Sequence, residues 1–144
     1  MFKKILYPTD FSDVSKKALE FVKGLKEAGA EEVVILHIVD MRHFTGPDIG
    51  SALDLAMLEE AMENRAALEI EALEKELTKC GFTVKTRVEH GIPFREVLRI
   101  EEEEDVSITV IGSHGKSNLK EMFLGSVSEM VIRKAKKPVI VVKR

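Results

Sequence analysis

Cysteine is almost absent from this sequence, since Cys80 is the only one among 144 residues. One thiol cannot form an intramolecular disulfide, which excludes a disulfide-stabilised secreted fold and favours a reducing, cytoplasmic setting. We expect Cys80 to be a small apolar filler near a helix end rather than a reactive thiol. No apolar run approaches the roughly 20 residues of a membrane-spanning helix. A strand is expected directly after the first few residues, so we also expect no signal peptide and no membrane partner.

A concentrated basic segment is missing as well. The 22 Lys and Arg residues are balanced by 25 Asp and Glu residues, which gives a formal net charge of −3. Binding to a nucleic-acid backbone requires clustered positive charge, so nucleic acid is not expected as the main partner. The length suits one domain with a sizeable core, and we expect a single domain over residues 1–144.

Two common phosphate-binding motifs do not occur. The Walker A motif requires a glycine five residues before Gly115, where this sequence has Val110, and the Gly-x-Gly of the Rossmann fingerprint occurs nowhere. Instead, an apolar run over residues 108–111 leads into Gly112, Gly115 and, ten positions later, Gly125. Glycines let backbone N–H groups approach an anion closely, and a following helix adds the positive end of its dipole. This stretch therefore predicts a phosphate-binding loop.

Apolar and amphipathic segments alternate along the whole chain. Five short apolar or alternating runs predict strands, over residues 4–7, 32–39, 82–89, 108–111 and 139–142. Helical patterns between them are typical of a parallel α/β sheet, which binds ligands at the carboxyl ends of its strands. Polar residues follow the first strand at Thr9 and Asp10 and the fourth strand from Gly112 onward. The two groups form one site only if those strands are neighbours, which the residues alone do not establish.

Two helices carry recognisable start signals. Thr9, Asp10 and Ser12 offer cap oxygens to the first helix, and Ser126 with Glu129 has the spacing of a capping box for the last one. The apolar face expected of the first helix consists of Ala18, Phe21, Val22 and Leu25.

The segment between the second and third strands has two parts. Residues 41–51 contain two glycines and a proline without periodicity, which fits a lid and a plain connector equally well. Residues 52–80 carry apolar side chains every three or four positions and predict a helix about 43 Å long at roughly 1.5 Å per residue. A domain of this size does not need that length, so the first turns are expected to project, bend or be loosely ordered.

The histidines and the acidic run of this sequence do not have the spacing that is typical of metal ligands. His37 lies alone within an apolar run, where a hydrogen-bonded core histidine is the more common outcome, and His90 has no assigned role. The acidic run over residues 101–105 is interpreted as the solvated end of a helix. We therefore predict no metal site made by protein side chains.

Three stretches resemble the universal stress protein family, in its ATP-binding branch. The spacing Gly112-x2-Gly115-x9-Gly125-Ser126 is similar to the nucleotide-binding signature of that family, and the segments YPTDFS at residues 7–12 and KPVIVV at residues 137–142 match as well. The resemblance covers nearly the whole chain. It implies a single-domain α/β fold with an open parallel five-stranded sheet, helices on both faces, and the strand order 3-2-1-4-5 of adenine nucleotide alpha hydrolase-like proteins.

The resemblance also implies which residues bind ATP. Adenine and ribose are expected against Pro8, Thr9, Asp10, Ile38 and Ile111. The triphosphate is expected on Gly112, His114, Gly115, Gly125, Ser126, Val127 and Ser128, with Mg²⁺ or Mn²⁺ held mainly through the phosphates. Asp10 suits a helix cap as well, and His114 fits a phosphate contact and a solvent-facing loop equally well. A homodimer through Val139–Val142, an expected edge strand, is implied too.

The function expected on this basis is that of an ATP-binding regulatory or stress-response protein, a switch with slow hydrolysis at most. Phosphoryl transfer requires a group that orients the nucleophile. Lys116 or Lys120 could neutralise charge, but no carboxylate or glutamine stands out for that role, so no catalytic residue is assigned. The alternative is a genuine ATPase or a nucleotidyl-transfer enzyme of similar topology. An interaction scaffold without a nucleotide is disfavoured because the glycine signature is intact.

Overall fold

The computed structural model describes residues 1–40, 42, 52–114 and 125–144, and within them five strands and four α-helices alternate. The proposed lid, apart from Arg42, and Gly115 of the glycine signature lie outside the described residues. The elements are β1 (Lys4–Pro8), α1 (Asp13–Gly24), the short 3-10 helix η1 (Leu25–Ala28), β2 (Glu32–Val39), α2 (Ala52–Lys79), β3 (Thr83–His90), α3 (Pro93–Glu103), β4 (Ile108–Gly112), α4 (Ser126–Lys134) and β5 (Val139–Val142).

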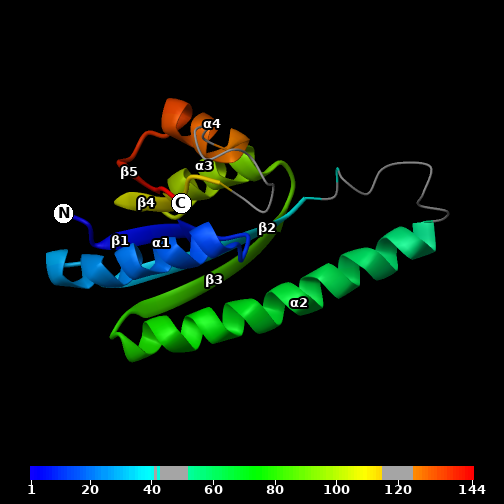
Figure 1. Ribbon diagram of the computed structural model, residues 1–144, viewed down its shortest axis with the longest axis horizontal. Helices are drawn as coiled ribbons and strands as arrows, with labels where there is room; N and C mark the ends of the chain where they lie inside the picture. Colours follow the sequence, from blue (N-terminus) through cyan, green and yellow to red (C-terminus); the bar gives the residue numbers. More distant parts are fainter. Residues whose placement is uncertain (41, 43–51, 115–124) are drawn as a thin grey trace.

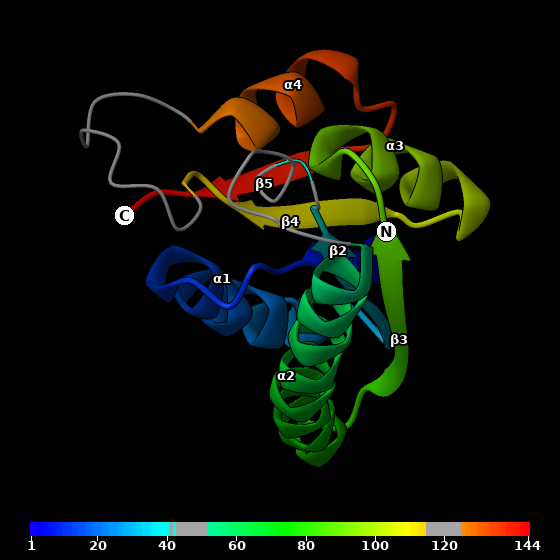
Figure 2. The same ribbon diagram turned by 90° about the vertical axis from the view of Figure 1, so that its right-hand side faces the viewer.

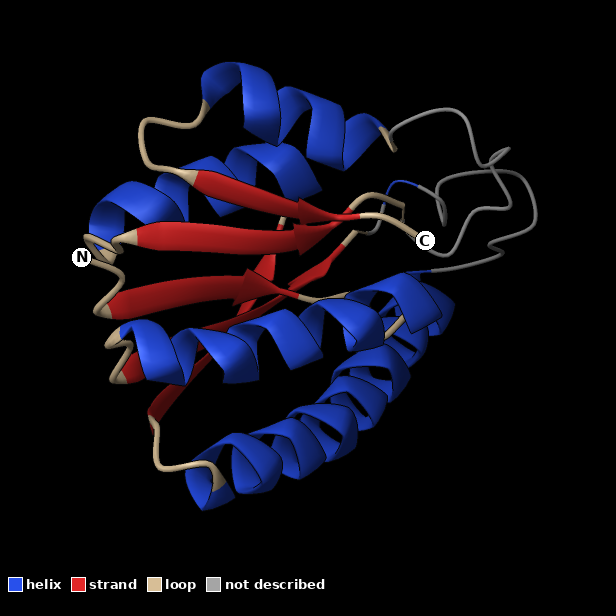
Figure 3. Cartoon of the chain, turned by 60° about the vertical axis from the view of Figure 1, so that its left-hand side comes forward, coloured by secondary structure: helices blue, strands red, loops and turns tan. Residues whose placement is uncertain are grey.

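The strands form one parallel sheet in the order β3-β2-β1-β4-β5, which confirms the expected 3-2-1-4-5 topology (Figure 3). β1 pairs with β4 in the register Ile5↔Ile108 and Leu6↔Thr109. All side chains of β4 are buried, as expected for an inner strand of a sheet covered on both faces. The pairing brings the carboxyl ends of β1 and β4 together.

Helices cover both faces of the sheet (Figures 2 and 3). α1 and α2 pack on one face, where Val22 and Leu77 join a core cluster with Ile5 of β1. α3 and α4 pack on the other face, where Ile100 and Val131 join a second cluster with the strand residues whose side chains point to that face. Fully burying one such aliphatic side chain contributes about 1.5–3 kcal/mol, so these two clusters hold the strands in place.

The apolar face of α1 differs from the expected one. Val14, Ala18 and Val22 follow each other at four-residue intervals and are buried against the sheet. Because this face of α1 packs on the sheet, Leu19 is buried, at 4% exposure, whereas the Phe21 side chain is half exposed, at 50%. The assignment of Phe21 to the core was therefore wrong.

α2 extends past the ends of the strands (Figure 1). Its buried residues begin at Ala66 and end at Leu77, so none of residues 52–65 is buried. This confirms the expected projection. Neither α2 nor any other described helix is long and apolar enough to cross a membrane. At the far end Leu77 and Phe82 fill the core, and Cys80 is exposed, so the expectation that Cys80 is an apolar filler was wrong.

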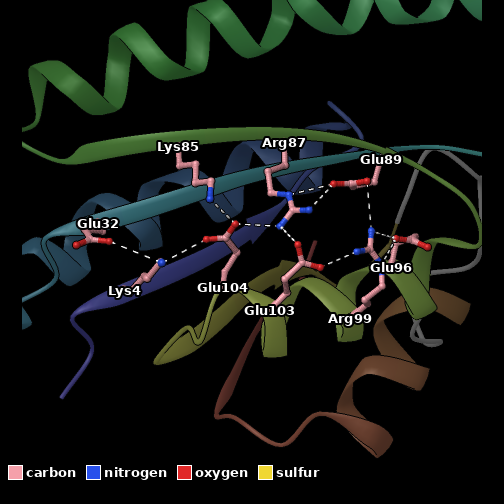
Figure 4. A network of polar contacts seen from close by, with 9 residues as sticks. All are labelled: Lys4, Glu32, Lys85, Arg87, Glu89, Glu96, Arg99, Glu103 and Glu104. Carbon is pink, nitrogen blue, oxygen red and sulfur yellow. Dashed lines mark hydrogen bonds and ion pairs between the residues drawn. The ribbon is translucent and has the colours of Figure 1, made fainter.

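The acidic end of α3 is not simply solvated. Glu101 and Glu104 are only 1% and 8% exposed, which corrects the interpretation of residues 101–105 as a solvated run. The Glu104 carboxylate lies 2.7 Å from Lys85 Nζ and 2.9 Å from Arg87 Nη1 on β3. Together with Lys4 of β1 these side chains belong to an ion-pair network between β3 and α3 (Figure 4). The Glu104 carboxylate can be buried because positively charged side chains from β1 and β3 pair with it.

Candidate functional site

The carboxyl ends of β1 and β4 meet where the sheet reverses its winding. β1 is followed by α1 and β4 by the segment that leads to α4, so two helix N-termini approach the same edge of the sheet. Open α/β sheets bind ligands at this position, because the connections leave a crevice between the diverging chain segments.

Every predicted site residue that the structure describes lines one cavity in this crevice. The cavity has a volume of about 200 Å³ and opens to solvent. The predicted residues that line it are Pro8, Thr9, Asp10, Ile38, Ile111, Gly112, His114, Gly125, Ser126, Val127 and Ser128.

Four further lining residues were not predicted: Ser15, Leu36, Pro93 and Val97. Two of them had a signal in the sequence. Leu36 lies two positions before Ile38, so both side chains point to the same face of β2. Pro93 follows β3, whose carboxyl end lies on the same edge of the sheet. Ser15 and Val97 reach the cavity from helices, and no local pattern distinguishes them.

The turn between β1 and α1 is fixed by hydroxyl groups. Ser15 Oγ donates a 2.6 Å hydrogen bond to Thr9 Oγ1, which also accepts from the backbone N–H of Phe11 at 3.0 Å. The Tyr7 hydroxyl donates to the Ser15 carbonyl at 2.7 Å. Burial raises the pKa of this Tyr7 hydroxyl, so it stays protonated as a donor. Phe11 has a φ of 64°, a rare conformation that these bonds help to hold.

Asp10 and His37 support the same turn. Asp10 Oδ1 accepts a 3.0 Å hydrogen bond from the backbone N–H of Ser12, which confirms its role in the turn. A ligand contact for Asp10, which lines the cavity, stays a prediction. His37 lies 2.8 Å from the Thr9 carbonyl through Nδ1 and stacks on Phe11, with ring centroids 4.5 Å apart. His37 is thus the hydrogen-bonded structural histidine that the sequence suggested.

Gly112 allows β4 to approach the start of α1. A Cβ atom at this position would lie 3.0 Å from Val14 Cγ1 and 3.2 Å from the Ser15 nitrogen, both too close for an unshifted neighbour. The Gly112 carbonyl accepts a 2.7 Å hydrogen bond from Ser128 Oγ on α4. The Ser128 hydroxyl is therefore engaged within the protein, so its expected contribution to an anion would come from its backbone N–H.

α4 begins one residue earlier than the capping-box pattern implies. Gly125 is the N-cap, with a φ of −64° and a ψ of 154°, and no side chain caps the helix. Glu129 instead donates its backbone N–H to Gly125 and pairs its carboxylate with Arg133 at 2.9 Å. The capping box was wrong because Ser126 is already inside the helix. The first N–H groups of a helix have no partner within it and carry the positive end of its dipole. The residues at this end of α4, 125–128, line the cavity.

His114 is buried rather than solvent-facing. Its side chain is 6% exposed and lines the cavity. Nδ1 lies 2.8 Å from Ser113 Oγ, and Nε2 has no hydrogen-bond partner among the described residues. A buried polar atom without a partner is costly in a protein interior. An acceptor in the cavity would satisfy it, which makes the environment of His114 suited to an anionic ligand.

The two sides of the cavity differ chemically. Ile38, Ile111 and Val97 form an apolar part that suits a flat ring, while His114 and the start of α4 offer hydrogen-bond donors. Asp10 is the one carboxylate among the described lining residues, and none of these is a lysine or arginine. This arrangement fits a ligand with an apolar planar end, a hydroxylated middle and an anionic end.

Comparisons with known proteins agree with this fold. A family model described as the universal stress protein family matches residues 1–143. Universal stress protein MJ0577 of Methanocaldococcus jannaschii is 46% identical over 156 aligned positions, which span 100% of this chain and 96% of that protein. Its solved structure superimposes with a TM-score of 0.91 and 47% identity, and covers 100% of this chain and 97% of that one.

Two more distant structures match in fold alone. A universal stress protein solved in complex with cAMP has 22% identity and a TM-score of 0.65, over 99% of this chain and 97% of that one. One from Archaeoglobus fulgidus in complex with dAMP has 21% identity and a TM-score of 0.61, over 99% and 98%. The five-stranded sheet is that of the adenine nucleotide alpha hydrolase-like fold. With nearly its whole length matched by the family model, this chain belongs to the universal stress protein family.

Proposed function

We propose that this protein binds ATP in the cavity between β1 and β4 and acts as a nucleotide-dependent regulatory protein. The observation that carries the proposal is His114, which lines the cavity together with the start of α4 and whose buried Nε2 lacks a partner among the described residues. A phosphate oxygen would accept from this atom and from the helix N–H groups. The adenine would lie against Ile38 and Ile111, with the ribose near Asp10.

Adenine nucleotides in two relatives support this proposal. The universal stress proteins solved with cAMP and with dAMP share this fold, and their low identity limits the comparison to the fold. Mg²⁺ or Mn²⁺ would be held mainly by phosphate oxygens, because Asp10 is the one carboxylate among the described lining residues. We place the protein in the cytoplasm, where an exposed thiol such as Cys80 stays reduced.

Binding is favoured over rapid catalysis. Phosphoryl transfer requires positive charge at the transferred group and a residue that orients the nucleophile. Asp10 is the one carboxylate among the described lining residues, and its Oδ1 is already used by the backbone of Ser12. The protein is therefore expected to retain ATP and hydrolyse it slowly at most, as a switch rather than an ATPase or a nucleotidyl transferase.

Two measurements test ATP binding. Mass spectrometry of the small molecules released when freshly purified protein is denatured should reveal an adenine nucleotide. ATP with Mg²⁺ at a hundred times its dissociation constant should stabilise the wild type by about 2.7 kcal/mol. Gly125→Val should lose most of that increment. Its backbone angles suit valine, so the variant is expected to fold, and we expect the added methyl groups to crowd the cavity that Gly125 lines.

Gly24→Val is the matched control, because Gly24 lies on α1 with open space around it. This variant should keep the full ATP increment. A Gly125→Val protein with an unchanged increment would contradict the assignment of the phosphates to the start of α4. Rapid multiple turnover of ATP by the wild type, absent in Gly125→Val, would instead establish the enzyme alternative.

We also propose a homodimer through β5. Val139–Val142 is an edge strand of the sheet, so one side of its backbone is not paired within the described sheet. Such an edge favours pairing with a second copy. A two-fold axis would join the two β5 strands antiparallel, so that the sheet continues from one protomer into its partner.

A further inference from the structure

Three side chains outside the nucleotide cavity meet where α2 passes the carboxyl end of β3. Glu59 and Glu63 lie one helical turn apart on α2, and His90 is the last residue of β3. His90 Nε2 lies 3.0 Å from Glu59 Oε1 and 2.7 Å from Glu63 Oε1. We propose that this Glu59–Glu63–His90 cluster binds a first-row divalent cation, with Zn²⁺ as the first candidate.

The geometry of the cluster requires little change to admit a cation. One ligand atom from each side chain lies within 4.8 Å of the other two. Ligands at about 2.0–2.2 Å from a shared ion are roughly 3–3.5 Å from each other, so small rotamer shifts suffice. The three side chains are 40–43% exposed, which leaves room for water to complete the coordination shell.

The donor set indicates the class of cation. One imidazole nitrogen with two carboxylates suits Zn²⁺ and its first-row neighbours, whereas Mg²⁺ and Ca²⁺ prefer shells made of oxygen alone. The two carboxylates repel each other at this helical spacing. A divalent cation between the two carboxylates would balance their charges and accept the imidazole nitrogen of His90 as a third ligand.

The location gives the cation a structural role. None of residues 52–65 is buried, so the first half of α2 lacks a core contact that would fix it on the sheet. His90 itself is well fixed, because it pairs in register with Val39 and the next residue, Gly91, donates its N–H to the Val39 carbonyl at 3.2 Å. A cation held by Glu59, Glu63 and His90 would fasten the projecting part of α2 to a rigid strand end. None of the three residues lines the nucleotide cavity.

Titration of the nucleotide-free protein with Zn²⁺ tests the site, with Co²⁺ absorption as a spectroscopic readout. The wild type should bind one ion. His90→Ala and the double variant Glu59→Gln/Glu63→Gln should bind it about tenfold more weakly or worse, since even outer-shell partners of a metal site contribute that much. Zn²⁺ should also slow amide exchange over residues 52–65 in the wild type and not in His90→Ala.

Two control variants separate this site from others. Glu60→Gln changes an exposed carboxylate on another face of α2 and should bind as the wild type does. Cys80→Ser removes the thiol beyond the far end of α2, roughly 25 Å along the helix from Glu63 at 1.5 Å per residue, and should also leave binding unchanged. Three outcomes would each show that the cluster is an ion pair and not a cation site. They are equal Zn²⁺ affinity in His90→Ala and wild type, loss of binding in Cys80→Ser alone, and no binding up to millimolar Zn²⁺.

Discussion

The Glu101 carboxylate on α3 accepts a 2.9 Å hydrogen bond from the backbone N–H of Lys136, the second residue after α4. The same oxygen accepts from the N–H of Lys137 at 3.2 Å, and the other accepts from Thr109 Oγ1 at 3.0 Å. One buried side chain therefore joins α3, the inner strand β4 and the turn that leads from α4 to β5. This turn sets the position of the last helix, whose start forms the donor side of the cavity.

Replacing Glu101 tests this connection. Glu101→Ala removes the acceptor of two backbone N–H groups and one hydroxyl, and the free energy of unfolding should fall by about 2–4 kcal/mol. Glu101→Gln keeps one carbonyl oxygen for the backbone groups and should lose clearly less. Urea unfolding measures both. An equal loss in the two variants would mean that packing, rather than hydrogen bonding, is the contribution of this residue.

Glu104 should make stability dependent on acid pH. Hydrogen bonds from Lys85, Arg87 and Lys4 lower the pKa of the Glu104 carboxyl from 4.5 to about 2, against the opposing effect of burial. Because the pKa is lower in the folded state, the contribution is complete above about pH 4.5 and is lost as the pH falls towards 2. The shift corresponds to roughly 3 kcal/mol at neutral pH.

Glu104→Gln should accordingly lower the free energy of unfolding by up to about 3 kcal/mol at pH 7 and by little at pH 2. Chemical unfolding at a series of pH values provides the measurement. Glu74→Gln, at an exposed position of α2, is the control and should follow the wild-type profile. The same loss for Glu104→Gln at both pH values would show that the ion pairs do not cause it.

His114→Leu should separate stability from binding. The change removes a buried Nε2 that has no partner among the described residues, but it also leaves the buried Ser113 hydroxyl without its Nδ1 partner, so we expect the stability of the ligand-free protein to change little. The same change removes a donor to the ligand, and ATP affinity should fall about 5- to 100-fold, the equivalent of 1–3 kcal/mol. Ligand-free unfolding and ATP titration measure the two effects separately.

Ser113→Ala is the companion variant, because its hydroxyl lies next to Nδ1 of His114 and not in the cavity lining. It should weaken ATP binding less than His114→Leu does. An unstable His114→Leu protein with normal ATP affinity would mean that the imidazole is a structural group.

The proposed dimer can be tested on the backbone of β5. Ser113 donates its N–H to the Val142 carbonyl and Thr109 donates to the Pro138 carbonyl, so these alternate residues face β4. The N–H of Val141 therefore points to the open edge, where a second β5 would accept it. Val141→Pro should remove this donor and yield a folded monomer, because edge strands tolerate proline.

Val141→Ala keeps the N–H while shortening the side chain, and it should remain a dimer. Sedimentation velocity distinguishes the two outcomes. Val141 also packs beside the core cluster under α3 and α4. The alanine variant therefore shows how much stability is lost with that packing alone, while the N–H is kept. Val141→Pro protein that dimerises as strongly as the wild type would exclude the β5 interface.

Local patterns predicted much of this fold. The apolar run over residues 32–39 became β2 with the same bounds, and the helical pattern over residues 52–80 became α2, which ends one residue earlier. Such signals succeed because the period of apolar residues and the backbone limits of glycine and proline act over a few neighbouring positions. The order of the strands came from the resemblance to a family, because no local pattern states which strands pair.

The sequence by itself determined the number and kind of elements, the edge that carries the polar residues, and the glycine-containing segment beside the last helix. Only the tertiary structure decided that Glu101 and Glu104 are buried, that Gly125 rather than Ser126 caps α4, and that His114 turns inward. It also placed His90 of β3 next to Glu59 and Glu63 of α2. The reason is physical: the environment of a charged or polar side chain depends on partners distant in the chain, and these meet it only when the sheet and its helices have packed.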